Sequence, residues 1–162
     1  MNEAYSTKFK QLLAMKNNVG MELGVSKWYE VTQDAVDSFA RLTEDHQWIH
    51  TNPEKAAHSS PYGATVAHGF YILAMTTKFT REAFQIEDRD VGINYGLDKV
   101  RFPNAVRVGS LIRGRVSLQG YDEIENGARF KVKVLIEIKE QDKPACVAEF
   151  LIQMYVDPDK SS

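Results

Sequence analysis

The chain has 162 residues, of which 43% are hydrophobic and 26% charged, and its formal net charge at pH 7 is −2. This length and composition are typical of one globular domain, and the charge provides no basic field for nucleic acid. The sequence has no apolar run of about 18 residues that would indicate a membrane span and no secretory signal, and its single cysteine excludes an internal disulfide framework. We therefore expect one domain over residues 1–162, located in the cytoplasm, without membrane or nucleic-acid partners.

The N-terminal part of the chain, residues 1–20, is predicted to form a helical arm. Phe9, Leu12 and Leu13 recur at the spacing of one helix face. Such an arm is expected to pack on a sheet edge or on a partner subunit, and it is given no part in catalysis. At the other end, residues 157–162 are polar and are expected to form a frayed tail.

A strand over residues 25–31 and a helix after it lead the chain to Asp45. Thr32 or Asp34 can cap this helix, because a short polar side chain at that position accepts a hydrogen bond from a free main-chain N–H. The apolar residues of the helix are interpreted as core. The helix therefore contributes to function only by fixing where the acid stands.

Residues 45–69 contain all four histidines of the chain and begin with an acid, Asp45. Asp45 and His50 are five residues apart, whereas residues on one face of a helix are three or four apart. If these two side chains meet, the residues between them must turn the chain, which places the pair on a loop after a helix. Asn52 and Pro53 have the residue types of an N-cap and a first helical position, so a short helix is expected next.

The pairing of an acid with an imidazole suits proton transfer, because each group can accept or donate a proton near neutral pH when its surroundings tune it. The alternative interpretation is a capping Asp45 and a solvated His50, which explains most such pairs. Spacing alone does not decide between the two.

The segment from His68 to about residue 84 is predicted to be a helix that is apolar nearly all round at first and more polar downstream. Its beginning is therefore expected to be wrapped by other structure. Gly69 falls in the first turn, where free N–H groups and the positive end of the helix dipole favour an oxyanion. His68 is interpreted as making a structural hydrogen bond at the helix start, with a direct catalytic role as the alternative.

The C-terminal half is interpreted as successive antiparallel strands that follow a charged loop over residues 85–90. An Asn-Gly dipeptide at 126 and 127 indicates a hairpin. Apolar residues alternate with polar ones over 130–138 and 146–156, as in strands with one buried face. Cys146 lies in the second of these apolar stripes, so it is interpreted as a core residue rather than a nucleophile.

The sequence does not indicate a metal site or a phosphate loop. No histidine pair has the spacing of helical metal ligands on a predicted helix, because His46 and His50, four residues apart, span the predicted turn. There is no glycine-rich phosphate-binding loop. His58 has polar neighbours and is expected to be solvated.

Four motifs occur in an order that resembles a known family. They are DHQWIH at 45–50, VAHG at 66–69, GINYGLDKVRFP at 92–103 and KPACVAE at 143–149. Together they resemble the MaoC-like dehydratases, which are related to (R)-specific enoyl-CoA hydratases, and in particular the NodN-like 3-hydroxyacyl-thioester dehydratase branch. The similarity runs from about residue 31 to 155.

The resemblance implies an α+β hot-dog fold, an antiparallel sheet wrapped around a central buried helix, paired with a second copy as a double hot-dog homodimer. It implies that Asp45 and His50 are the catalytic acid–base pair, that the Gly69 N–H binds the thioester carbonyl, and that no cofactor or metal is needed. Gln47 stands where many relatives carry Asn and is a candidate for a supporting polar contact. Tyr62 is a candidate for lining the acyl pocket, or else a turn residue.

The implied activity is the reversible hydration of trans-2-enoyl thioesters, with enoyl-CoA as the expected substrate, to (R)-3-hydroxyacyl thioesters. Arginines at positions 101, 107, 113 and 115 either meet CoA phosphates or lie on solvated strand faces. Thioester hydrolysis on the same fold and non-catalytic binding of an acyl thioester are the alternatives. Retention of both Asp45 and His50 favours the enzyme, because a pure binder needs neither.

Overall fold

The structure, a computed structural model, describes residues 3–156, so the expected polar tail at 157–162 lies outside the described residues. In chain order, its elements are β1 (Tyr5–Phe9), η1 (Leu12–Asn18), β2 (Glu22–Val25), β3 (Tyr29–Glu30), α1 (Gln33–Thr43), α2 (Trp48–Thr51), α3 (Pro53–Ser59), α4 (Gly69–Ala83), β4 (Phe84–Ile86), β5 (Arg89–Arg101), β6 (Leu111–Ile124), β7 (Gly127–Ile138) and β8 (Cys146–Val156). None of the helices within this range combines the length and apolar character that crossing a membrane requires.

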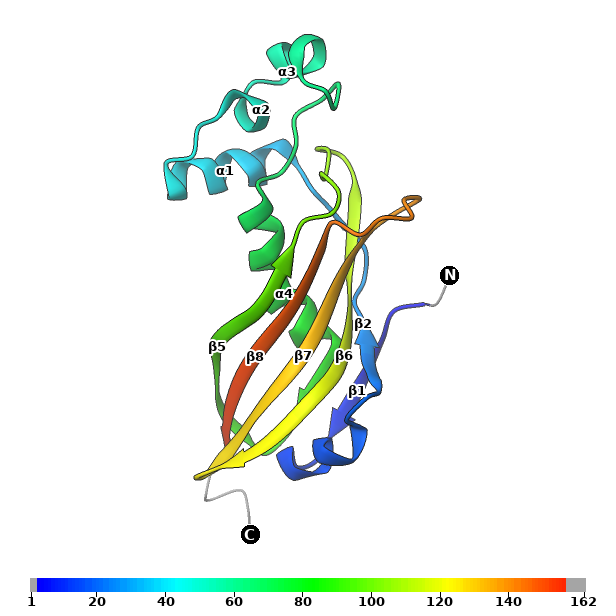
Figure 1. The fold of residues 1–162 in the computed structure, drawn as a ribbon, viewed down its shortest axis with the longest axis vertical. Helices are drawn as coiled ribbons and strands as arrows, with labels where there is room; N and C mark the ends of the chain where they lie inside the picture. The colour runs from blue at the N-terminus through cyan, green and yellow to red at the C-terminus, as the bar shows by residue number, and fades with distance from the viewer. Residues whose placement is uncertain (1–2, 157–162) are drawn as a thin grey trace.

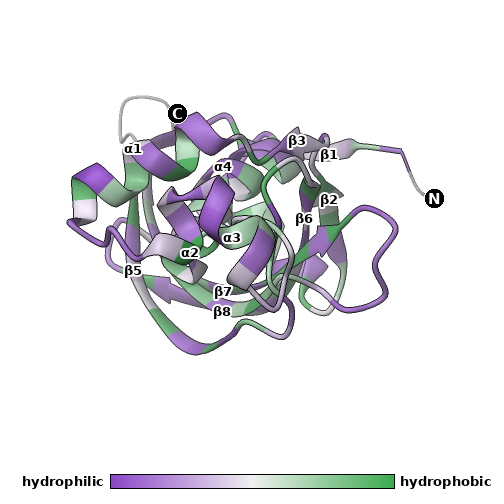
Figure 2. Ribbon diagram, turned by 90° about the horizontal axis from the view of Figure 1, so that it is seen from above, coloured by the Kyte–Doolittle hydropathy of each residue, from purple (hydrophilic) through white to green (hydrophobic). Residues whose placement is uncertain are grey.

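One sheet of eight strands wraps around α4. Its order is β4-β1-β2-β6-β7-β8-β5, and β3 pairs with β6 beside this path. Every described pair is antiparallel except β1 with β4, so the sheet is mixed rather than purely antiparallel as expected. In Figure 1, α4 lies behind the long strands, and the view from above in Figure 2 shows the sheet curving around it.

The helix α4 is held close to the sheet by one face and by a glycine. Its buried residues recur at helical spacing and are Ile72, Thr76, Phe79, Thr80 and Ala83. Gly114 of β6 faces Phe79, and a Cβ built on this glycine would lie 2.3 Å from the Phe79 Cβ. The close approach of helix and strand therefore depends on the missing side chain at 114.

Short helices form a cap beyond one end of the sheet, near the first turn of α4 (Figure 1). Thr32 Oγ1 accepts a hydrogen bond from the Ala35 N–H at 3.3 Å, so Thr32 rather than Asp34 caps α1. Asn52 Oδ1 accepts from the Lys55 N–H at 2.9 Å at the start of α3, which confirms the predicted cap. These caps fix where α1 and α3 begin.

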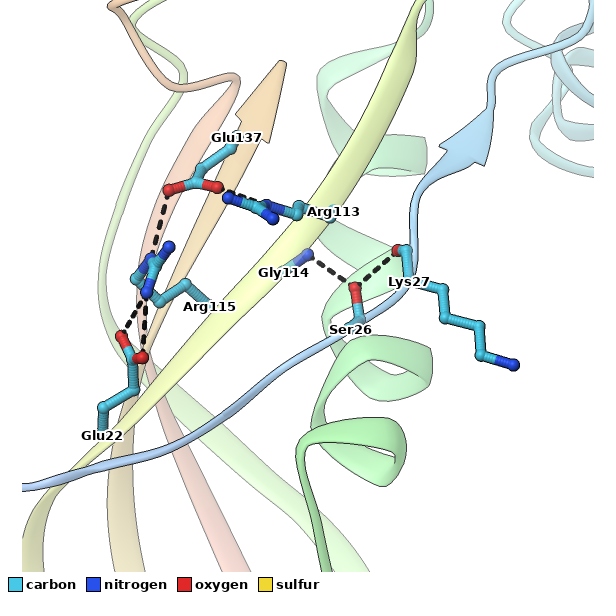
Figure 3. A network of polar contacts seen from close by, with 7 residues as sticks. All are labelled: Glu22, Ser26, Lys27, Arg113, Gly114, Arg115 and Glu137. Carbon is cyan, nitrogen blue, oxygen red and sulfur yellow. Dashed lines mark hydrogen bonds and ion pairs between the residues drawn. The ribbon is translucent and has the colours of Figure 1, made fainter. Parts of the chain in front are cut away.

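A polar network on β2, β6 and β7 ties the first part of the chain to the middle of the sheet (Figure 3). Arg115 contacts both carboxylate oxygens of Glu22 at 2.8 Å, and its Nε donates to Glu137 at 3.1 Å. Arg113, whose side chain is only 7% exposed, donates to the other oxygen of Glu137 at 2.6 Å. Beside them, Ser26 Oγ accepts from the Gly114 N–H at 2.9 Å, which continues the pairing past the end of β2.

The expected N-terminal helical arm is wrong for most of its length. Residues 5–9 form a strand between β2 and β4, because the Tyr, Thr and Phe side chains suit an extended chain once it has neighbours on both edges. Within residues 3–20, only η1 is helical, and it is a 3-10 segment whose buried residues, Leu12 and Met15, are three residues apart. Leu13, predicted to share the buried face, is 57% exposed.

Three further expectations need correction. The strand expected over 25–31 is two short strands, β2 and β3, and the charged loop expected over 85–90 is β4 with the start of β5. The start of α4, expected to be wrapped, carries Phe70 with 71% exposure, whereas Phe79 near its end has none. The described chain therefore buries the end of α4 inside the sheet, whereas at its beginning it buries Ile72 and leaves Phe70 at the surface.

The C-terminal strands follow the alternation in the sequence. β6 and β7 form the predicted hairpin, and Asn126 in its turn has a positive φ of 57°. Phe130, Val132, Val134, Ile136 and Ile138 are all buried, as predicted for one face of β7. Cys146 is fully buried in the apolar face of β8, which confirms its prediction as a core residue.

Candidate active site

Asp45 lies in the loop that leaves α1. Glu44 ends the helix in the left-handed conformation, with φ of 59°, and so turns the chain away from the helix axis. The Asp45 side chain is 54% exposed, and its carboxylate accepts no hydrogen bond within residues 3–156. Its position is consequently set by its main chain.

His50 lies in the one-turn helix α2 and is 7% exposed. Its Nδ1 lies 2.6 Å from the carbonyl oxygen of Val66. Because a carbonyl only accepts, Nδ1 carries the proton and Nε2 of the neutral ring keeps a free lone pair. Burial lowers the pKa of His50 below its ordinary value, and the Val66 carbonyl opposes this shift only in part. The ring is therefore a neutral proton acceptor at neutral pH.

His68, the residue before α4, joins these two groups. Its ring stacks on the ring of His50 with a centroid separation of 3.8 Å and an interplanar angle of 26°. Its Nε2 lies 3.0 Å from the main-chain oxygen of Asp45 and 4.0 Å from the Asp45 carboxylate. The hydrogen bond expected at the helix start is therefore made to the Asp45 loop instead.

The three side chains converge. One carboxylate oxygen of Asp45 and one ring nitrogen from each of His50 and His68 lie within 4.8 Å of one another. A water that makes two hydrogen bonds of about 2.8 Å bridges groups roughly 4.5–5 Å apart. This upper limit on the distance between the carboxylate and the imidazole is compatible with one shared water.

The same three groups are also a possible set of metal ligands, which spacing along the chain did not indicate because His68 is 18 residues beyond His50. A zinc ion lies about 2.0–2.1 Å from a ligating nitrogen, along the lone pair in the ring plane. With the rings stacked at 26°, an ion that close to both would lie out of the plane of at least one of them. The arrangement fits a shared water better than a metal.

Gly69 is the first residue of α4, as predicted, and the N-cap position before it is His68. The His68 side chain makes no cap hydrogen bond, and the Gly69 N–H has no acceptor within the described part of the chain. A free N–H at a helix start is suited to a developing negative charge. A Cβ on Gly69 would lie 3.2 Å from the Phe102 ring, so the glycine also permits this close approach.

The two weaker candidates for substrate binding, Gln47 and Tyr62, lie outside the cluster of Asp45, His50 and His68. Gln47 is exposed, and it contributes its main-chain oxygen, which accepts from the His50 N–H at 2.9 Å and starts α2. Tyr62 lines a cavity of about 480 Å³ whose other walls include Arg107, and neither member of the acid–base pair lines that cavity. A role for either side chain in binding substrate stays a prediction.

The arginines that were left open are partly accounted for. Arg113 and Arg115 are engaged by Glu137 and Glu22, so they are structural members of the sheet network. Arg101 donates to the main-chain oxygen of its neighbour Val100 at 2.7 Å.

The sequence profile of the MaoC like domain matches residues 14–140. The chain is 40% identical over 146 residues to 3-hydroxyacyl-thioester dehydratase Z of Mycobacterium tuberculosis, and the aligned region covers 90% of this chain and 96% of that protein. It is 39% identical over 151 residues to Nodulation protein N of Rhizobium leguminosarum bv. viciae, which covers 91% of this chain and 92% of that protein.

Among solved structures, the R-hydratase PhaJ1 of Pseudomonas aeruginosa superposes with a TM-score of 0.66 at 17% identity and covers 86% of this chain and 83% of that one. At this identity the match shows a shared fold, and it confirms the predicted hot-dog architecture. The profile and the two sequence relatives carry the assignment further than the fold. The chain belongs to the MaoC like domain family.

Proposed function

We propose that the protein catalyses the reversible hydration of trans-2-enoyl thioesters to (R)-3-hydroxyacyl thioesters. The observation that carries the proposal is the convergence of the Asp45 carboxylate and the His50 ring within 4.8 Å of each other. The relative from Mycobacterium tuberculosis is named as a 3-hydroxyacyl-thioester dehydratase, which is the reverse reaction. Thioesters of coenzyme A are the expected substrates.

The proposed chemistry begins with a water held between Asp45 and His50. One member of the pair, for which the free Nε2 of neutral His50 is suited, takes a proton from the water as its oxygen bonds to C3 of the enoyl group. Electron density moves to the thioester oxygen, which the Gly69 N–H stabilises as it gains enolate character. The pair then returns a proton to C2, so that one water has been added across the double bond. Dehydration uses the same groups in reverse.

The test is the loss of enoyl absorbance with crotonyl-CoA and longer enoyl-CoAs. Asp45→Asn and His50→Ala are each expected to lower kcat about a hundredfold or more, since positioned acid–base groups contribute about 10²–10⁴-fold. His58→Ala is the matched control, because His58 is exposed on α3 and lies outside the cluster. Unchanged rates in both active-site variants would remove the pair from the mechanism.

The same assay separates the alternatives. A thiol reagent added to the reaction detects free CoA, and its release without loss of the acyl chain's double bond would indicate a thioesterase. Binding of enoyl-CoA with no turnover at any chain length would indicate a non-catalytic binding module. Both outcomes would contradict the proposal.

We also propose that two copies join through β5. This strand lies at the end of the sheet order and, among the described strands, pairs only with β8. Four apolar residues along it are 43–52% exposed: Val91, Ile93, Tyr95 and Leu97. An exposed apolar edge strand favours pairing with another chain, and a second copy of β5 would cover it. The exposed Phe70 at the start of α4 packs edge-on against Phe102, just beyond the end of β5, with ring centroids 6.3 Å apart.

Sedimentation equilibrium tests this assembly. The wild-type protein is expected to have twice the mass of one chain, and Ile93→Pro, which removes a main-chain donor from the strand, is expected to weaken the dimer. A wild-type protein that stays monomeric at micromolar concentration would contradict the proposal.

A further inference from the structure

His68 is buried in a position that its own hydrogen bonding does not explain. The residue is 3% exposed, and its Nδ1 has no hydrogen-bond partner within residues 3–156. It occupies the N-cap position of α4, where Ser, Thr, Asp and Asn are preferred because they can accept from the first free N–H groups. Its side chain makes no such cap bond. As a purely structural residue it is a poor choice, since a buried polar atom without a partner costs stability.

Two of the contacts that His68 does make lead to the acid–base pair. One face of its ring stacks on His50, and its ring also contacts Phe39 of α1, with centroids 5.2 Å apart. Its Nε2–H donates to the main-chain oxygen of Asp45 at 3.0 Å. The ring thus connects α1, α2 and the start of α4, which are the elements on which the pair and Gly69 stand.

The residues of the Asp45 loop are held by two different sets of hydrogen bonds. The main-chain oxygens of His46 and Gln47 accept from Thr51, and that of Gln47 also accepts from the His50 N–H, so this part of the loop is fixed to α2. Asp45 itself is fixed through His68, because its exposed carboxylate accepts no hydrogen bond within the described residues. Removal of the His68 donor would therefore free the acid while leaving the rest of the loop attached.

We propose that His68 is a positioning residue, which holds the Asp45 carboxylate at the distance from the His50 ring that lets the two share one water. It does so through its bond to the Asp45 carbonyl and its stack on His50. The role rests on the proposed hydration reaction. It also leaves the N–H of Gly69 uncapped, since the side chain at the N-cap position is directed to Asp45 rather than to the helix.

The test compares two substitutions with a control. His68→Phe keeps a flat ring against His50 and removes both the donor and the unpartnered nitrogen. His68→Gln restores an N–H near the place of Nε2 and removes the ring. The control is His58→Phe, since His58 also bonds a main-chain oxygen, that of Glu54 at 2.8 Å, but on the exposed surface of α3. The readouts are kcat and KM with crotonyl-CoA, the melting temperature, and the backbone NMR order parameter of the Asp45 N–H.

We expect His68→Phe to lower kcat about 10- to 100-fold, because small misplacements of a catalytic group have effects of about 10². KM should change little, the melting temperature should not fall, and the order parameter at Asp45 should decrease. His68→Gln should recover part of the lost kcat and of the lost order at Asp45, and His58→Phe should match the wild type. A residue with only a structural role would instead lower the melting temperature without changing kcat.

Different results contradict different statements. If the wild type turns over and His68→Phe keeps its kcat within about twofold, with the order parameter at Asp45 unchanged, the positioning role is wrong and the hydration proposal stands. If the wild type does not hydrate any enoyl-CoA, the hydration proposal fails, and the order parameter at Asp45 still decides whether His68 holds the Asp45 loop.

Discussion

The substitution Gly114→Ala tests whether α4 is seated on β6 as closely as the structure indicates. The added Cβ would lie 2.3 Å from the Cβ of Phe79 and 2.6 Å from its Cγ. Carbon atoms in contact are about 3.5–4.0 Å apart, so the two elements must separate by about 1 Å or more. Phe79 is fully buried, and β6 is hydrogen-bonded to β2 and β7 on its two edges. Neither side can yield locally.

Inserting a methyl group into a packed core costs about 1–3 kcal/mol, and the rigid surroundings place this change at the upper end, near 3 kcal/mol. With a urea m-value of about 2 kcal/mol/M, the unfolding midpoint should fall by about 1.5 M. The melting temperature should fall by about 6–12 °C, at roughly 2–4 °C per kcal/mol for a chain of this size.

The control is Gly120→Ala on the same strand, where the new Cβ would lie 3.9 Å from the Lys131 Cβ, an ordinary contact. Replacing a glycine in a compatible conformation stabilises by about 0.4–1 kcal/mol through the unfolded state. Urea unfolding at one fixed protein concentration measures both variants, since association makes the midpoint depend on concentration. A free energy of unfolding for Gly114→Ala that lies within about 0.5 kcal/mol of the wild-type value, against an expected loss of ~3 kcal/mol, would refute the close seating of α4.

Three further outcomes are expected. Because burial lowers the pKa of His50 from its ordinary 6.5, the acid limb of kcat/KM should have its midpoint below pH 6.5, and a midpoint above pH 6.5 would contradict the burial argument. As the pH falls, the unfolded chain binds the proton at this histidine before the folded chain does, so the free energy of unfolding should also decrease below pH 6.5. Glu137→Ala, which removes the carboxylate between two arginines including the nearly buried Arg113, should cost about 2–3 kcal/mol in urea unfolding, whereas Glu123→Ala at an exposed pair should cost under about 1 kcal/mol. Cys146 is buried with its pKa raised to about 11, so a thiol reagent at pH 8 should label it within the mixing time only after denaturation.

The parts of the fold that the sequence predicted are those whose information is local. The alternation of β7, the turn at Asn126 and the caps at Thr32 and Asn52 depend on residues within a few positions of one another. Each was found from spacing and residue type alone.

The parts that were missed depend on distant partners. Thr7 lies opposite Phe84 in the parallel pair of β1 and β4, and the residues around Thr7 contain no pattern that predicts this pairing. The apolar start of α4 indicated burial, but the exposed Phe70 shows that the described chain does not itself cover that end. Periodicity identifies an apolar face without identifying what lies against it.

In the candidate site, too, the residues were predicted from local sequence, whereas a contact between distant residues was not. Asp45, His50 and Gly69 were selected from residue types, spacing and the resemblance. The contact of His68 with Asp45 joins residues 23 positions apart and needed the fold. The VAHG motif was a signal for it, because a histidine at an N-cap position is unusual and invites the question of where its ring points.

The place of β1 in the sheet has a consequence for how the chain is made. β1 comes first among the described strands, yet its two neighbours are β2, which follows at once, and β4, whose residues 84–86 come much later. β2 in turn waits for β6, which ends at residue 124. Pairings between such distant residues form slowly, because a long loop must close first. During synthesis β1 therefore lacks β4 and β2 lacks β6 until those later strands have emerged, and chaperones that shield nascent chains would meet both strands throughout that interval.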